Sequence, residues 1–184
     1  IRRGGYGRGD LFFKGENPPD GALINFYLKD KSAEPATLEV ADPLTPSIKT
    51  TFILDEAEAG INRVAWDFRF DPPEATIKTM VGNIKRQTDP AMLPATLTDE
   101  QKAAIKAALA DLEKWGTNFR KVMDVQRRVF EIIRPGRGFF FGGMRGGMGG
   151  RMAEPGTYTV TLTVGGKTYT ETVVVRADPM LPGN

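Results

Sequence analysis

Four acidic residues could supply carboxylates for acid–base chemistry, since they lie near predicted turns and strand ends: Glu16, Asp20, Asp67 and Asp71. Two carboxylates that converge in a cleft can act as general acid and general base. Acidic side chains at turns and strand ends are usually solvated, however, and we expect Asp67 to pair with Arg63 or Arg69. The sequence therefore predicts no catalytic residue.

Neither histidine nor cysteine occurs among the 184 residues. This composition excludes Ser-His-Asp catalysis, thiolate nucleophiles, disulfides and the common zinc sites. Carboxylate chemistry, lysine chemistry and oxygen-ligated calcium remain, but the chain has no EF-hand spacing and no phosphate-binding loop. We expect a protein that is not an enzyme and that has no cofactor-binding or metal site.

The segment 134–152, RPGRGFFFGGMRGGMGGRM, is rich in glycine, arginine, phenylalanine and methionine. Glycine loses the most backbone entropy on ordering, so an ordered segment of this kind needs contacts that hold it. Three interpretations stay open: a loop folded on its own domain, a surface for a protein or lipid partner, and binding of single-stranded nucleic acid. We predict the partner surface, without nucleic acid, formed by Phe139, Phe140, Phe141, Met144, Arg145, Met148 and Arg151.

The overall charge gives no evidence of an electrostatic potential that would attract nucleic acid or a membrane surface. The chain has 25 basic and 23 acidic residues, a net charge of +2. No apolar run approaches the length that crosses a bilayer, so we predict no transmembrane segment. The chain begins at Ile1, and we expect a processed product or part of a longer chain.

A β-hairpin near the end of the chain is the clearest structural signal. Apolar residues alternate with threonine from Thr157 to Val164, which predicts a strand with one buried face. Gly165-Gly166 predicts a two-residue turn, which would pair Val164 with Lys167. Tyr158 and Leu162 then lie on the apolar face and are predicted core residues. Glu171 is the one misfit on that face.

Further short strands are predicted at 22–28, 36–40, 48–54 and 60–69, with Leu11-Phe12-Phe13 as a first short strand. Trp66 shares a face with Val64 and Phe68, so it is a predicted core residue. About seven strands with proline and glycine between them favour a mainly β fold, an antiparallel immunoglobulin- or fibronectin-III-like sandwich.

A helical pattern interrupts the strands. Thr98 and Gln101 form a predicted capping box, and apolar residues recur at helical spacing until Pro135. The pattern predicts a helical hairpin or one bent helix, inserted over 94–135. The predicted organisation is an N-terminal arm or linker (1–16) and a β-sandwich domain (17–184) that includes this insertion and a Gly/Met/Arg-rich loop (136–152).

Three segments resemble the C-terminal domain of bacterial sortilin-like proteins, which are BNR-repeat, glycosyl-hydrolase-like β-propellers. The segments are Asn17-Pro18-Pro19 with Gly21-Ala22 and Tyr27-Leu28-Lys29, then Gly60 to Arg69, then Pro155 to Val160. The resemblance implies an immunoglobulin-like sandwich and a periplasmic or extracellular location, with a position peripheral to a membrane as one form of it, and it implies no catalytic residue. More loosely, such a domain without its propeller resembles an accessory subunit on the periplasmic side of a bacterial photosynthetic reaction-centre–light-harvesting complex.

Two functions follow as hypotheses. The first is a structural module that stabilises a larger extracytoplasmic assembly, in the specific form a photosynthetic membrane complex, through contacts with its protein subunits. The second is a carbohydrate-binding accessory domain of a secreted propeller protein, which needs exposed aromatic side chains in a row. Tyr6, Tyr27 and Tyr169 are the tyrosines available for such a row.

Overall fold

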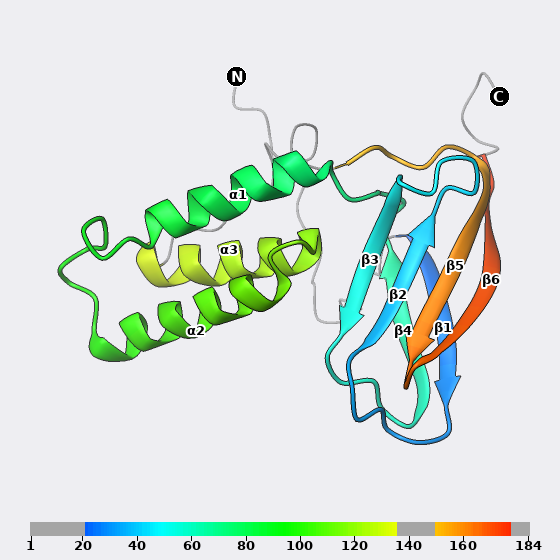
Figure 1. The fold of residues 1–184 in the computed structure, drawn as a ribbon, viewed down its shortest axis with the longest axis horizontal. Coiled ribbons are helices and arrows are strands. Elements are labelled where there is room, and N and C mark those ends of the chain that lie inside the picture. Colours follow the sequence, from blue (N-terminus) through cyan, green and yellow to red (C-terminus); the bar gives the residue numbers. More distant parts are fainter. Residues whose placement is uncertain (1–20, 136–149, 178–184) are drawn as a thin grey trace, which may run out of the picture.

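The computed structural model of the chain describes residues 21–135 and 150–177 (Figure 1). The N-terminal arm 1–16 and the strand expected at Leu11-Phe12-Phe13 lie outside these residues. So do six of the seven predicted contact residues, all except Arg151. The predictions made for those positions therefore stay predictions.

Six antiparallel strands form two sheets in the described part of the chain. Their bounds are β1 (Ala22–Leu28), β2 (Ala36–Ala41), β3 (Lys49–Leu54), β4 (Gly60–Trp66), β5 (Gly156–Val164) and β6 (Lys167–Val175). Strands β1 and β4 pair with each other, and the second sheet has the order β3-β2-β5-β6. Strand β3 is the edge nearest the helices, and β6 is the opposite edge (Figure 1).

The two sheets share one apolar core. The alternation of apolar and polar residues along each strand turns one face of each sheet toward this core. Trp66 is fully buried at its centre, with Val64 on β4 and Leu38 and Val40 on β2. The rings of Tyr158 and Trp66 meet edge to face, with 5.4 Å between centroids. The core assignments of Trp66 and Tyr158 are thus confirmed, and Leu162 packs against the same core while partly exposed.

The β5–β6 hairpin has the predicted register. Val164 pairs with Lys167 across a turn made by Gly165 and Gly166, both of which have positive φ. A two-residue turn of this kind matches the twist of the strands, and glycine adopts its backbone angles without steric strain.

Strand β4 ends at Trp66, three residues earlier than the sequence predicted. Phe68 takes a left-handed conformation, with φ of 58°, which turns the chain out of the strand. The following residues pair instead with the chain just before β5: Phe70 N–H donates to the Arg151 carbonyl at 3.0 Å, and Ala153 N–H to the Phe68 carbonyl at 2.7 Å.

The described residues between β4 and β5 form three helices, where the sequence predicted a helical hairpin or one bent helix: α1 (Glu74–Gln87), α2 (Asp99–Trp115) and α3 (Phe119–Ile133). The capping box of Thr98 and Gln101 is confirmed at the start of α2. The sequence prediction missed α1, because Pro73 precedes it without any side-chain cap. With α1 included, helices and strands are of similar extent, so the protein is mixed α/β and the expectation of a mainly β fold was wrong.

The helices have a core of their own beside the sheets (Figure 1). Ile77, Met80 and Ile84 of α1 pack with Val122 and Val129 of α3, all at helical spacing. Leu112 of α2 completes this second core. The helical region therefore buries its apolar face largely within itself, and it contacts the sheets through a smaller junction.

Candidate functional site

The junction between helices and sheets forms along the outer edge of β3. Asp71, which follows β4, lies against this edge and occupies its exposed hydrogen-bonding groups. Its N–H donates to the Lys49 carbonyl at 2.8 Å. Its carboxylate accepts from the Thr50 hydroxyl at 2.9 Å and from Thr51 N–H at 3.0 Å. An edge strand covered in this way cannot pair with another chain.

Two residues at the start of α3 complete the junction. Asn118 caps the helix by accepting from Lys121 N–H at 3.0 Å, and its amide donates to the Thr51 carbonyl at 2.9 Å. Arg120 donates to the Thr50 hydroxyl at 3.2 Å and pairs with Asp67 at 3.0 Å. The Arg120 guanidinium also lies 4.0 Å from the centre of the Phe52 ring, a cation–π contact. These contacts fix the helices against β3.

The environment of Asp71 changes its acidity. Burial raises the pKa of the Asp71 carboxyl above its ordinary value of 3.8, and the nearby Asp67 charge adds a small rise. The hydrogen bonds from Thr50 and Thr51 and the Arg120 charge act in the opposite direction, with less effect. The prediction that Asp71 is a solvated turn residue was therefore wrong.

Asp67 also has a different partner from the one predicted. It pairs with Arg120 of α3, whereas the Arg63 side chain donates to the Asn25 amide oxygen at 2.9 Å. Asp67 and Asp71 thus both lie beside Arg120. Sequence reasoning missed Asn118 and Arg120, since a partner 53 residues away along the chain leaves no local signal. The helix-capping type of Asn118 was the one available indication.

A groove runs along this junction, between β3, the start of α1 and the turn before α3. Its volume is about 1130 Å³. Apolar side chains of Ile48, Ile53, Ile77 and Trp115 line it together with Pro72 and Pro73. The charged residues along it are Lys49, Asp71, Glu74, Lys114 and Arg151. The groove is large enough for several residues of an extended peptide.

Arg151 is the one predicted contact residue within the described chain, and it lies on this groove. Its guanidinium, half exposed, pairs with Glu154 at 2.9 Å, and its carbonyl accepts from Phe70 N–H. Gly150, just before it, passes so close to the Phe70 carbonyl that a Cβ there would lie 2.1 Å from the oxygen. The end of the glycine-rich segment is therefore anchored beside the groove.

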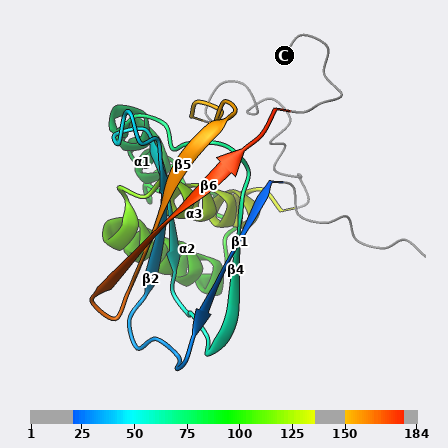
Figure 2. The same ribbon diagram turned by 90° about the vertical axis from the view of Figure 1, so that its right-hand side faces the viewer.

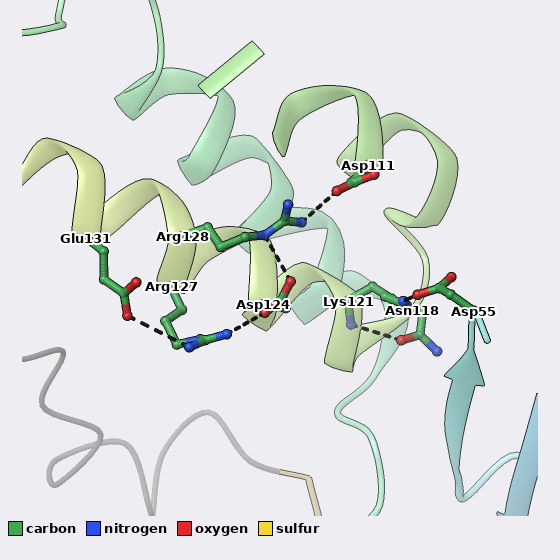
Figure 3. A network of polar contacts seen from close by, with 8 residues as sticks. All are labelled: Asp55, Asp111, Asn118, Lys121, Asp124, Arg127, Arg128 and Glu131. Carbon is green, nitrogen blue, oxygen red and sulfur yellow. Dashed lines mark hydrogen bonds and ion pairs between the residues drawn. The ribbon is translucent and has the colours of Figure 1, made fainter. Parts of the chain in front are cut away.

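A second, smaller hollow lies between α2, α3 and the end of β3, with a volume of about 330 Å³. Its acidic residues each pair with a cation, as Figure 3 shows: Asp55 with Lys121, Asp111 with Arg128, and Asp124 with Arg127 and Arg128. Exposed pairs of this kind contribute about 0–1 kcal/mol each. With every carboxylate held by a cation, the hollow offers no unpaired acid.

Across residues 21–135 and 150–177, no group of three or more acidic residues is arranged to hold a metal ion. No helix within the same ranges is long and apolar enough to cross a membrane.

The tyrosines expected for sugar binding do not form a row in the described structure. Tyr27 lies on β1 and is 69% exposed, whereas Tyr169 lies on β6, in the other sheet, and is 54% exposed. Tyr6 lies outside the described residues. Tyr27 and Tyr169 alone therefore make no stacking platform of the kind that a glycan-binding face requires.

Comparison with known proteins found no matching family model, no matching curated protein and no matching solved structure. The resemblance to the C-terminal domain of sortilin-like propeller proteins therefore stays a prediction, and so does the extracytoplasmic location that it implies.

Proposed function

We propose that the protein is a non-enzymatic interaction module of a larger assembly, and that the groove beside β3 binds an extended segment of a partner protein. The observation that supports this most directly is the groove itself, with its apolar lining and the predicted contact residue Arg151 along it. We further propose that the two sheets form an immunoglobulin-like sandwich and that the assembly is extracytoplasmic, as the sequence resemblance implies. A photosynthetic membrane complex is one specific form of such an assembly.

The charges along the groove favour an acidic segment. The carboxylate of Asp71 is occupied by Thr50 and Thr51, and that of Glu74 pairs with Lys78 at 2.8 Å. Among the described residues Lys114 has no ion pair, and its ammonium lies 4.7 Å from the centre of the Trp115 ring. A carboxylate of the partner would therefore meet Lys114, and beside it the half-exposed guanidinium of Arg151, which it would share with Glu154.

The apolar lining accounts for the other half of the recognition. Ile53 and Trp115 lie along the groove with the prolines that precede α1. Apolar side chains of a partner that are buried there are removed from water, which stabilises the complex by about 25 cal/mol per Å² of apolar surface. The expected ligand is thus an extended peptide with an acidic residue beside apolar ones.

Selection from a random peptide library displayed on phage tests this proposal. We expect the chain to enrich peptides that combine an acidic residue with apolar neighbours, and the binding to weaken as salt concentration rises. In the Lys114→Glu/Arg151→Glu variant, binding of the selected peptides should fall at least about tenfold, since two attractive charges become repulsive.

A charge reversal on the exposed face of α2, Lys106→Glu, is the matched control and should keep the affinity. Equal binding by the groove variant and the wild-type chain would show that the groove is not the peptide site. Failure to enrich any peptide would refute the peptide-binding module, and binding of the chain to a glycan array would instead favour the carbohydrate-binding alternative.

A further inference from the structure

The two edges of the four-stranded sheet differ in how their backbone groups are used. At β3, Asp71 and Asn118 bond the outward groups of Lys49 and Thr51. At β6, no described residue bonds the outward groups. Figure 2 looks onto this hairpin, with β6 on the side of β5 away from β2 and the helices behind. An edge of nine residues that no described residue covers is a template for pairing with another strand.

The hairpin turn determines which groups of β6 point outward. In a hairpin with a two-residue turn, the residues that flank the turn exchange hydrogen bonds, so Lys167 bonds to Val164. Alternation along the strand then directs the odd-numbered residues toward β5. The N–H and C=O groups of Thr168, Thr170 and Thr172 point away from the sheet.

On β6, the residues next to the turn are exposed, although part of β5 opposite them is buried. Tyr158 and Val160 are buried, whereas Tyr169 is 54% exposed and Lys167 and Glu171 are exposed on the same face. Glu171, the misfit noted in the sequence, pairs with the buried Val160 but is itself exposed on the edge strand. The Tyr169 ring, with Lys167 and Glu171 two residues before and after it, is therefore exposed at this edge.

We propose that β6 pairs with β6 of a second copy of this chain, antiparallel, with Tyr169 opposite its counterpart. The register joins the two four-stranded sheets into one, around a two-fold axis at Tyr169. Thr168 of each copy then exchanges hydrogen bonds with Thr170 of the other copy.

Charge selects this register. With Tyr169 on the axis, Lys167 of each copy lies opposite Glu171 of the other, which forms two ion pairs on one face of the joined sheet. Moving the axis to Glu171 would place the two Glu171 carboxylates opposite each other, which is repulsive. Moving it to Thr170 would leave Glu171 opposite Tyr169, without an opposite charge.

The proposed dimer also removes the exposed features of this edge. The two Tyr169 rings lie side by side on the face where each is now exposed, and paired aromatic residues across strands are favourable. Because the hairpins overlap near their turns, the bodies of the two copies extend in opposite directions. The groove beside β3 lies at the other edge of the sheet, so this interface is separate from the proposed peptide site.

Sedimentation velocity over a concentration series tests the dimer with a charge exchange. The Lys167→Glu variant alone and the Glu171→Lys variant alone each place like charges opposite one another, so the dissociation constant should rise about tenfold or more. A mixture of the two variants places a lysine opposite every glutamate and should regain the wild-type dimer. Lys106→Glu, on α2, should dimerise as the wild type does.

Thr170→Pro provides a second variant, because it removes an outward N–H without removing a hydrogen bond to β5. It should abolish the dimer while far-UV circular dichroism and tryptophan fluorescence stay as in the wild type. A wild-type chain that is monomeric up to high concentration would overturn the proposal. So would a dimer that both charge variants retain, a mixture that does not reassociate, or a Thr170 amide equally protected from hydrogen exchange at all concentrations.

Discussion

Asp71 is the residue on which the junction depends most. Its backbone and its carboxylate together hold three groups at the edge of β3, on Lys49, Thr50 and Thr51. A partly buried carboxylate is costly unless it is well hydrogen-bonded, and here the stabilising bonds come from the strand it covers. The residue thus closes one sheet edge at the cost of a raised pKa.

Asp71→Asn should destabilise the fold by about 1–3 kcal/mol at neutral pH, because the amide can accept from one of its two donors while the other is left unpaired. Urea unfolding followed by circular dichroism measures the loss. Asp111→Asn, which removes an exposed ion pair, is the comparison and should change stability by about 1 kcal/mol or less.

The pH dependence of that difference follows from the raised pKa. The folded state binds the Asp71 proton more tightly than the unfolded state does, so deprotonation favours unfolding. The stability of the wild-type chain relative to Asp71→Asn should fall as pH rises from 3.8 through the higher folded pKa, and level off above it. A difference that rises with pH over this window would contradict the assignment.

The helices form an element of their own between β4 and β5. They bury their apolar residues chiefly against one another. The chain enters α1 just after Asp71, and Gly150, where the described chain resumes before β5, lies against the carbonyl of the neighbouring Phe70. The sequence predicted an insertion over 94–135. In the structure the inserted region begins earlier, at α1, because α1 packs in the same core as α2 and α3.

Replacing residues 74–149 with a short Gly-Ser linker should leave a folded β protein. Far-UV circular dichroism should lose its helical component and keep the β signal, with Trp66 still buried in fluorescence. The free energy of unfolding should fall, because Asn118 and Arg120 no longer bond to β3. Loss of all β signal would show that the sheets require the helices in order to fold.

At the scale of the whole molecule, two apolar cores are coupled through a few polar contacts. One core centres on Trp66 and the other on Val122 and Val125, while Asn118 and Arg120 connect them. Because these contacts are few, the cooperativity of unfolding should depend on them more than on any equal number of surface residues.

Asn118→Ser/Arg120→Ala should separate the unfolding of the two regions, since serine keeps the helix cap but loses the amide donor to Thr51. In a Trp115→Phe background, Trp66 fluorescence reports the sheets and circular dichroism reports mostly the helices. The helical transition should move to lower denaturant, and the Trp66 transition should move less. Arg127→Ala, an exposed position on the same helix, should leave the transitions coincident.

The sequence by itself determined the local features of this protein. The alternation around Tyr158 and the two glycines specify the β5–β6 hairpin and its register, and the row containing Val64 and Trp66 specifies a buried strand face. The capping box at Thr98 specifies the start of α2. Each of these signals comes from neighbouring residues, whose period and turn chemistry a linear pattern records.

Only the tertiary structure decided the junction, the groove and the open edge. Asp71 and Asn118 meet β3 from positions far along the chain, and no local pattern encodes such a meeting. The exposure of Glu171 likewise depends on the position of β6 at the edge of its sheet. The strand pattern alone therefore showed Glu171 as a misfit, and the packing of the sheets places it at an exposed edge.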